Sequence, residues 1–194
     1  MNPLANIKNY RLILASKSPR RQQLLADLGL SFEVITLDVD ESFPESMPVN
    51  EVAAFLAEKK ASAFTGSLNE NSLVITADTI VAQGNTVLNK PDDVEHACKM
   101  LRILSGKKHE VITGVCLMSE TKKVVFSAKT DVWFKELSEE EISFYIENYK
   151  PFDKAGAYGI QEWIGYIGIY RIDGSYFNVM GLPVQQLYTQ LSIF

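Results

Sequence analysis

Two arginines stand in an unusual place at the start of a predicted helix. In the segment ASKSPRR (15–21), Ser18 is a suitable N-cap and Pro19 suits the first helical position. Arg20 and Arg21 then lie in the first turn, at the positive end of the helix dipole, where acidic side chains are preferred. Backbone N–H groups and guanidinium groups at such a helix start would together bind a polyphosphate. The alternative is a solvated basic turn that pairs with a nearby acid.

A single carboxylate, Asp78, follows the apolar run SLVITA (72–77). A continuous apolar run of this length is typical of a strand that is buried on both faces. Ligands of open α/β sheets gather outside the carboxyl ends of the strands, so Asp78 is placed to bind a metal ion or to activate water. The alternative is a turn-forming aspartate that caps the next segment.

Other charged residues are candidates with weaker local support. Lys60 follows Leu56 by four residues on a predicted helix (49–64), so it extends either to the helix rim or into a polar cleft. Lys90 precedes a proline in a loop and by itself indicates nothing. The acidic loop LDVDES (37–42) could supply a metal ligand, although such loops are usually solvated.

The composition is that of an ordinary globular chain and excludes several classes of protein. Its 194 residues, 46% hydrophobic, suit one domain or two tightly joined lobes. A net charge of −5 argues against a nucleic-acid-coating or membrane-surface protein. The two cysteines lie far apart without metal-site spacing, and no stretch is long and apolar enough to span a bilayer. We therefore expect a cytoplasmic protein without nucleic-acid or membrane partners.

The predicted elements that must position these residues alternate between strands and helices. Strands are expected at 11–15, 31–36 and 72–77, in a hairpin at 79–89, and as an antiparallel pair at 109–120 and 123–134. Helices are expected at 18–29, 49–64, 92–104, 138–149 and 183–194. The glycine-rich stretch 153–183 is expected to form strand and turn. This order predicts an α/β layered fold with a mixed, twisted sheet.

Three stretches of the chain, in order and with consistent spacing, resemble the Maf family, also called septum-formation-inhibitor-like proteins. They are LILASKSPRRQQLLADLGLSFEVI, VITADTIVAQGNTVLNKPDDVEHACKMLRILSGKKHEVITGV, and PFDKAGAYGIQ with IDGSYFNVMGLPV. The resemblance implies one Maf-like domain over 1–194, with an α/β/α fold similar to the inosine-triphosphate pyrophosphatases (Ham1) and a cleft between two lobes. It also implies cleavage of nucleoside triphosphates to the monophosphate and pyrophosphate with a divalent cation, Mg²⁺ or Mn²⁺.

The resemblance also implies roles for individual residues. Substrate phosphates would be bound by Ser16, Arg20, Arg21, Lys60 and Lys90. Asp78 is implied as the catalytic proton acceptor and as a metal ligand, and Asp40 as a residue that assists with the metal. Three positions that govern specificity, Arg20, Thr79 and Gln161, are similar to the branch of the family that prefers dTTP and UTP.

We predict a house-cleaning pyrophosphatase that acts on dTTP, UTP or modified pyrimidine nucleotides. The alternative is a nucleotide-sensing regulator of cell division or septum formation that does not hydrolyse the triphosphate. A third hypothesis is a phosphomonoesterase, which would release orthophosphate. The sequence leaves the oligomeric state open, with a homodimer as one option.

Overall fold

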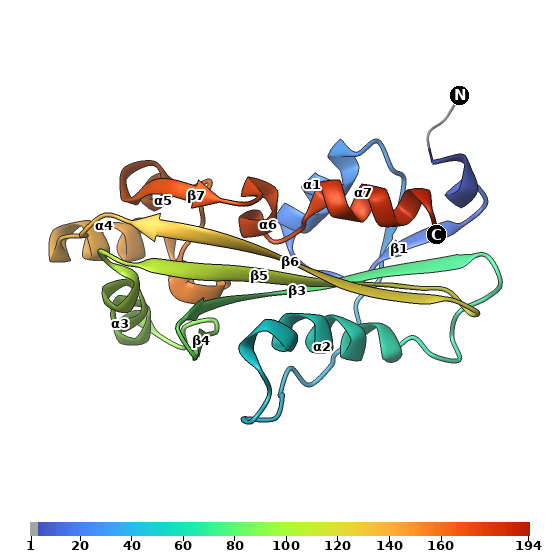
Figure 1. The fold of residues 1–194 in the computed structure, drawn as a ribbon, viewed down its shortest axis with the longest axis horizontal. Helices are drawn as coiled ribbons and strands as arrows, with labels where there is room; N and C mark the ends of the chain where they lie inside the picture. The colour runs from blue at the N-terminus through green and yellow to red at the C-terminus, as the bar shows by residue number, and fades with distance from the viewer. Residues whose placement is uncertain (1–3) are drawn as a thin grey trace. The chain divides into compact units, whose positions relative to one another are not determined.

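The computed structural model describes residues 4–194 and contains a seven-stranded mixed sheet with helices packed on it (Figure 1). The strand order is β2-β1-β3-β5-β6-β7, with β4 paired to β3. The strands are β1 (Arg11–Leu14), β2 (Glu33–Val34), β3 (Ser72–Gln83), β4 (Thr86–Leu88), β5 (Lys108–Met118), β6 (Lys123–Phe134) and β7 (Ile169–Asp173). Strand β1 runs parallel to β2 and β3, whereas β4 and β7 pair antiparallel with β3 and β6. The predicted mixed α/β fold is confirmed.

The helices occupy most of the predicted positions. They are α1 (Pro19–Asp27), α2 (Val49–Ser62), α3 (Val94–Leu104), α4 (Glu139–Tyr149), α5 (Trp163–Gly168), α6 (Tyr176–Met180) and α7 (Val184–Ser192), with 3-10 turns η1 (Ala5–Ile7) and η2 (Ala155–Ala157). Across residues 4–194, none of these helices combines the length and the apolar character that a bilayer crossing requires.

The residues group into two compact units. The first unit comprises Met1–Asp78, Thr113–Ala128 and Gly181–Phe194, and the second comprises Thr79–Ile112 and Lys129–Met180. Strands β3, β5 and β6 contribute residues to both units.

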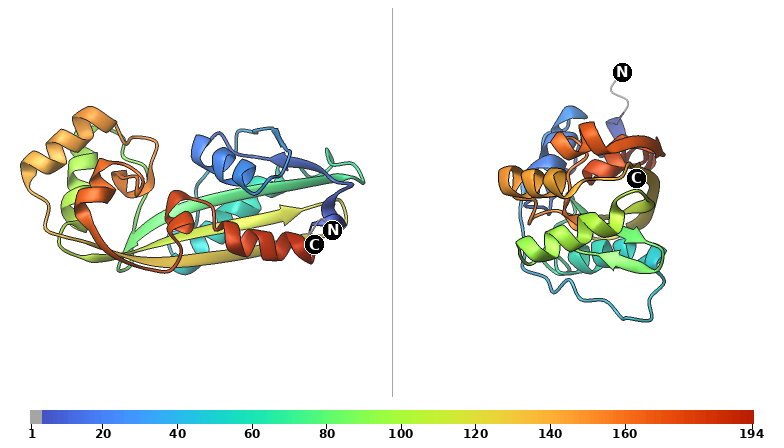
Figure 2. Two further views of the ribbon diagram at one scale, coloured as in Figure 1. Left: turned by 90° about the horizontal axis from the view of Figure 1, so that it is seen from above. Right: turned by 90° about the vertical axis from the view of Figure 1, so that its left-hand side faces the viewer.

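In the first unit, helix α2 covers one face of the sheet and helices α1 and α7 cover the other (Figures 1 and 2). Helix α2 packs closely because Gly114 has no side chain: a Cβ there would lie 2.2 Å from the carbonyl oxygen of Ala53. The buried Thr76 hydroxyl donates to the carbonyl of Ala57 at 2.6 Å. These contacts fix the middle of α2 against strands β5 and β3.

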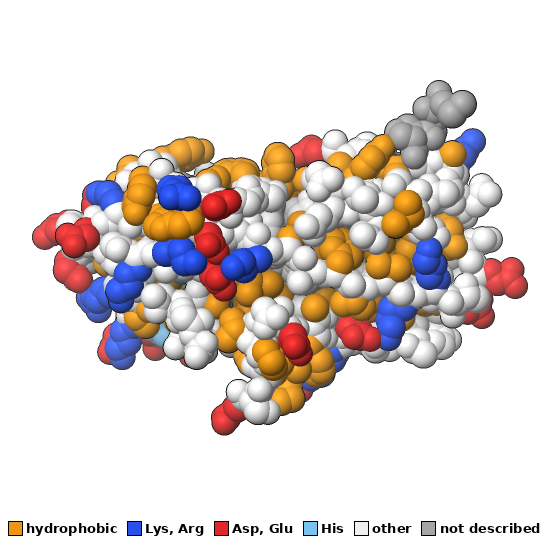
Figure 3. Space-filling view, viewed as in Figure 1, with side chains coloured by type: hydrophobic (Ala, Val, Ile, Leu, Met, Phe, Trp, Pro, Cys, Tyr) orange, Lys and Arg blue, Asp and Glu red, His pale blue; other side chains and the backbone are white. Residues whose placement is uncertain are grey.

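In the second unit, helices cover one face of the sheet and leave the other face exposed. The covered face holds an aromatic cluster in which the ring of Phe134 meets those of His109 and Tyr158 edge-on. Basic and acidic side chains gather on the open face (Figure 3). Among them, Lys108 Nζ lies 3.0 Å from Asp131 Oδ2. On this face the Arg171 guanidinium lies over the Trp133 ring, 4.4 Å from its centroid. Because the helices of this unit cover only the opposite face, the unit has two layers rather than three.

The glycine-rich stretch 153–183 differs from the expectation of strand and turn. It contains helices α5 and α6 on either side of the edge strand β7. Gly165 explains part of the error, because it is needed for close packing inside a helix: a Cβ there would lie 1.9 Å from the carbonyl oxygen of Ile160. A glycine that serves helix packing cannot be distinguished from a turn glycine by composition alone.

Candidate active site

The turn before helix α1 is held by its own serines. Ser18 is the N-cap, and its hydroxyl accepts a hydrogen bond from the Arg21 N–H at 3.4 Å. The buried Ser16 hydroxyl accepts from the Ser18 N–H at 3.2 Å, and the Gln22 side chain donates to the Ser16 carbonyl at 3.1 Å. The first turn of α1 contains no acidic residue, as the sequence predicts. The helix start is therefore rigid and electropositive.

Arg21 is anchored within the first unit and lies in the field of two carboxylates. Its Nε donates to the carbonyl oxygen of Gly181 at 2.8 Å. Burial lowers the pKa of Arg21, the nearby Arg20 lowers it further, and the charges of Asp78 and Glu41 raise it. An arginine keeps its charge under these influences, so the start of α1 presents a fixed cation beside acidic groups.

Lys60 joins the two carboxylates of this cluster. Its Nζ lies 2.5 Å from Asp78 Oδ1 and 2.7 Å from Glu41 Oε1. Lys60 comes from the last turn of α2, and its side chain is 17% exposed. Asp78 is 9% exposed and lies in the interior of β3. The strand continues to Gln83, so the prediction that it ends just before Asp78 is wrong. The sequence left two alternatives for Lys60, the rim of the helix and polar surroundings. The structure shows the second, because Lys60 lies between two carboxylates.

Asp40 lies apart from this cluster. Its carboxylate accepts from Lys59 Nζ at 2.9 Å and from the backbone and hydroxyl of Ser42. These hydrogen bonds lower the pKa of this exposed carboxyl to about 2. The metal role assigned to Asp40 from the resemblance stays a prediction. The residue that sequence analysis missed is its neighbour Glu41, which the acidic loop turns towards Lys60.

The carboxylates near Lys60 suit a divalent cation that is held jointly with a phosphate. Within residues 4–194 there is no group of three or more His, Cys, Asp and Glu side chains that would hold a metal alone. Glu41 and Asp78 contact the same ammonium group, so their nearest oxygens lie at most about 5 Å apart. Mg²⁺ is usually held by one or two carboxylates together with substrate phosphates and water. Asp78 and Glu41 therefore fit a metal that arrives with its nucleotide.

The remaining candidate residues belong to the second unit. Lys90 is exposed in the loop after β4, and Thr79 is partly buried in β3. Gln161 is also partly buried, and its Oε1 is buried without a hydrogen-bond partner among the described residues.

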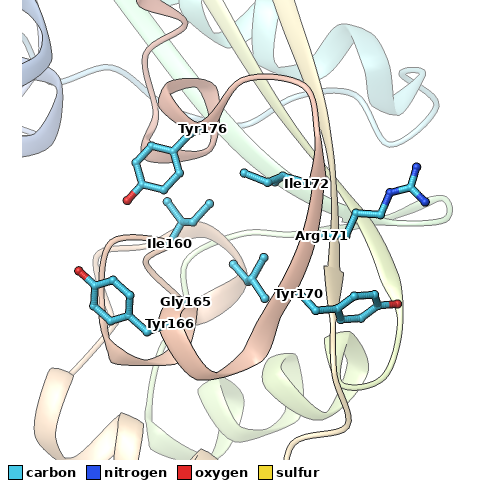
Figure 4. Close-up of a pocket in the computed structure, with 8 residues that line it drawn as sticks. Ile160, Gly165, Tyr166, Tyr170, Arg171, Ile172 and Tyr176 are labelled. Atoms are coloured by element: carbon cyan, nitrogen blue, oxygen red, sulfur yellow. The ribbon is translucent and has the colours of Figure 1, made fainter.

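The same unit carries a pocket of about 500 Å³ beside β7 (Figure 4). The pocket lining combines apolar and tyrosine side chains with one arginine: Ile160, Gly165, Tyr166, Ile169, Tyr170, Arg171, Ile172 and Tyr176. With a single cation and no carboxylate, this lining does not suit a triphosphate–metal complex.

Arginines at a helix start are a feature of nucleotide-binding α/β proteins, and here Arg21 lies in the field of the Asp78 carboxylate. Comparisons with known proteins identify the family within this class. The chain belongs to the Maf family, because the model of the family described as Maf-like protein matches residues 11–194.

Curated relatives cover nearly the whole chain. A "dTTP/UTP pyrophosphatase" of Phocaeicola vulgatus is 53% identical over 189 residues, which is 97% of this chain and 98% of the relative. A protein of the same name from Parabacteroides distasonis is 50% identical over 192 residues, 98% of this chain and all of the relative. Among solved structures, the Ham1 protein of Staphylococcus aureus matches with a TM-score of 0.43 and 15% identity, over 64% of this chain and 71% of that one.

Proposed function

We propose that this protein is a nucleoside triphosphate pyrophosphatase that converts dTTP and UTP to the monophosphate and pyrophosphate. The observation that carries the proposal is about 50% identity, over nearly the full length, to relatives named dTTP/UTP pyrophosphatases. The cluster of Arg21, Lys60, Glu41 and Asp78 supports it, because it combines cations for a polyphosphate with carboxylates for proton transfer.

The first unit supplies groups for each part of this reaction. Arg20, Arg21 and the N–H groups at the start of α1 bind the β- and γ-phosphates, with Ser16 holding the turn. A water oxygen forms a bond to the α-phosphorus, and the bond from that phosphorus to the α–β bridging oxygen breaks. Asp78 accepts the proton of the water, and pyrophosphate leaves with the bridging oxygen. Lys60 orients Asp78 and Glu41 and offsets the negative charge of the phosphates.

A divalent cation, Mg²⁺ or Mn²⁺, completes this proposal. Asp78 and Glu41 would hold it, and Asp40 remains the additional candidate from the same acidic loop. When bound, the metal neutralises charge on the phosphate oxygens.

The proposed pyrimidine preference rests on Gln161, Thr79 and Arg20, with Lys90 as a further phosphate contact. A glutamine amide donates to O4 of thymine or uracil and accepts from N3–H, and one such bidentate contact discriminates by about 1–3 kcal/mol. The buried Gln161 Oε1 without a partner supports this role, because a buried acceptor is usually satisfied.

The test is a product and substrate assay with Mg²⁺ and with Mn²⁺. We expect monophosphate and pyrophosphate as first products, and kcat/KM for dTTP and UTP at least about tenfold above that for CTP, GTP and ATP. Gln161→Ala should remove most of this preference and leave the products unchanged. Diphosphate with orthophosphate would contradict the reaction, and tight binding without turnover would indicate a nucleotide sensor.

The cellular setting forms part of the proposal. We place the reaction in the cytoplasm, where nucleoside triphosphates are made and where free thiols such as Cys98 and Cys116 stay reduced. A net charge of −5 supports a protein without nucleic-acid or membrane partners.

We further propose a homodimer that forms through strand β7. This strand ends the described sheet, and Tyr170, Arg171, Ile172 and Asp173 are all exposed. Antiparallel pairing of β7 with its copy, centred on Ile172, would place each Arg171 opposite the partner's Asp173. An unpaired edge with self-complementary charge favours such addition.

Sedimentation velocity tests this assembly. Arg171→Asp should shift the protein to a monomer, because four carboxylates would then meet across the pair. The exchanged variant Arg171→Asp/Asp173→Arg should restore the dimer. A monomeric wild type, or a dimer that is unaffected by Arg171→Asp, would contradict this interface.

A further inference from the structure

The segment Gly159–Glu162, which carries Gln161, is a tight turn. The Glu162 N–H donates to the Gly159 carbonyl at 3.0 Å, which places Gln161 inside the turn. The turn is closely packed, since a Cβ on Gly159 would lie 2.8 Å from the Glu162 carboxyl carbon. The position of the Gln161 amide therefore depends on what holds the two ends of this turn.

One hydroxyl contacts both ends. Tyr145, on helix α4, is fully buried, and its OH accepts a hydrogen bond from the Gly159 N–H at 3.0 Å. The same OH donates to Glu162 Oε2. Burial and the neighbouring carboxylate of Glu162 raise the pKa of Tyr145, so the hydroxyl keeps the proton that it donates. Tyr145 thus bridges the first and last residues of the turn with a single atom.

Lys154 holds the other carboxylate oxygen of Glu162. Its Nζ lies 3.1 Å from Glu162 Oε1 and 2.7 Å from Asp153 Oδ1, and the residue is 8% exposed. Both oxygens of Glu162 are therefore engaged, one by a tyrosine hydroxyl and one by an ammonium group. A carboxylate held at both oxygens leaves the turn little freedom to shift.

The orientation of the amide matters because glutamine alone does not choose between pyrimidines. Rotated by half a turn, the same amide would accept from the exocyclic amine of cytosine and donate to its N3. Selectivity needs the amide held within about 0.5 Å of one geometry, and such precision comes from the residues around it.

We propose that Tyr145, together with Glu162 and Lys154, forms a positioning network that fixes the Gln161 turn and thereby sets the preference for thymine and uracil over cytosine. This inference rests on the proposed role of Gln161 in base recognition. Tyr145 touches neither phosphate nor base in this scheme and acts through the turn.

The matched variants are Tyr145→Phe and Tyr149→Phe. Tyr149 stacks on Tyr145 from the next turn of α4, with ring centroids 5.1 Å apart, and it is exposed. Both substitutions remove one hydroxyl from the same helix, and only the first removes the bridge. We expect Tyr145→Phe to lower the ratio of kcat/KM for dTTP to that for CTP about fivefold to tenfold. Tyr149→Phe should leave that ratio unchanged, and the inhibition constant of inorganic pyrophosphate should be the same in both variants.

A purely structural role predicts a different result. Tyr145→Phe would then lower the melting temperature and leave the dTTP to CTP ratio at the wild-type value, which would overturn the inference. Glu162→Gln provides a second route if Tyr145→Phe does not fold. It keeps the hydrogen bond from Tyr145, weakens the contact with Lys154, and should lower the same ratio to a smaller extent. An unchanged ratio in a folded Glu162→Gln protein would also overturn the inference.

The Gln161→Ala background separates this inference from the proposed function. If Gln161→Ala itself leaves the dTTP to CTP ratio unchanged, base recognition by Gln161 fails, and the positioning network fails with it. If Gln161→Ala lowers the ratio and Tyr145→Phe does not, only the network fails. Adding Tyr145→Phe to Gln161→Ala should cause no further loss of selectivity.

Discussion

Each unit of this protein contains a lysine held between two carboxylates, and the two clusters differ in what surrounds them. In the first unit, Lys60 pairs with Glu41 and Asp78. In the second, Lys154 pairs with Asp153 and Glu162. The Lys60 side chain is 17% exposed and its cluster lies near Arg21, whereas the Lys154 side chain is 9% exposed.

Two clusters with the same three charges therefore have different roles in the two units. A buried ion pair gains little net stability unless its geometry is satisfied throughout, because both charges lose their hydration. The Lys154 cluster meets this condition through the hydroxyl of Tyr145, which engages the second oxygen of Glu162. The Lys60 cluster instead has an additional cation nearby, an arrangement that suits an incoming anion. We therefore expect substitutions in the first cluster to affect turnover and those in the second to affect stability and selectivity.

The largest expected effect is on turnover in the Asp78→Asn variant. Without the carboxylate, water activation and metal binding are both impaired, so kcat for dTTP should fall about 10²- to 10⁴-fold. The circular dichroism spectrum should match that of the wild type. Near wild-type turnover in the folded variant would contradict a catalytic role for Asp78.

Lys154→Met tests the role of the cluster in the second unit. Removing the ammonium group leaves the Glu162 carboxylate with an uncompensated charge, so the free energy of unfolding should fall by about 3–5 kcal/mol. Urea denaturation measures this loss, and Lys60→Met is the matched variant. The Lys60→Met protein should lose less stability and more turnover. Equal stability losses would remove the distinction between the two clusters.

The second unit should also carry an acid-sensitive group. Burial lowers the pKa of His109 to about 4 against a partial opposing effect of Asp131, so the ring is neutral when folded. Between pH 6.5 and 4 the unfolded chain binds the proton and the folded chain does not. The stability that depends on the neutral ring should therefore be fully present above pH 6.5. The free energy of unfolding should fall by about 3 kcal/mol as the pH drops to 4.

His109→Gln is the control for this acid sensitivity. It retains a donor and acceptor for the Tyr158 hydroxyl, which lies 2.7 Å from His109 Nε2, and removes the titrating ring. The slope of stability between pH 6.5 and 4 should flatten in this variant. Asp40 contributes little over this range, because the stability from a carboxyl whose pKa is lowered from 3.8 to about 2 is lost mainly between pH 3.8 and 2.

A smaller effect separates the two arginines of α1. Arg21→Gln should weaken dTTP binding and lower the free energy of unfolding by about 1–2 kcal/mol, because it removes the hydrogen bond to Gly181. Arg20→Gln should weaken dTTP binding to a similar extent and leave the hydrogen bond between Arg21 and Gly181 in place. Isothermal titration with a nonhydrolysable analogue and urea denaturation measure the two quantities. Unchanged affinity in both variants would contradict phosphate binding at this helix start.

The smallest effect is expected at Asp40. Asp40→Asn removes an exposed contact with Lys59, so kcat/KM for dTTP should stay within about twofold of the wild type. Glu41→Gln, one residue further along the loop, should lower kcat/KM strongly because Glu41 contacts Lys60. The opposite order of effects would assign the metal role to Asp40, as the family resemblance implies.

Much of the site was already determined by the sequence. The cap of Ser18 and Pro19 predicts where α1 begins, and local hydrogen bonds alone place Arg20 and Arg21 in its first turn. The apolar run before Asp78 predicts a buried strand, because continuous burial on both faces leaves no alternation. These features depend on neighbours within a few residues, which is why a single sequence contains them.

Only the tertiary structure decided which carboxylate joins Lys60 and what holds Gln161. Asp40 and Glu41 are adjacent acids in a loop without periodicity, and they point to different lysines because the path of the loop across α2 selects Glu41 for Lys60. Tyr145 is separated from Gly159 by 14 residues, and it meets both ends of the turn only because α4 packs in the second unit's core. Contacts of this kind depend on how elements pack, and no local pattern in the chain encodes them.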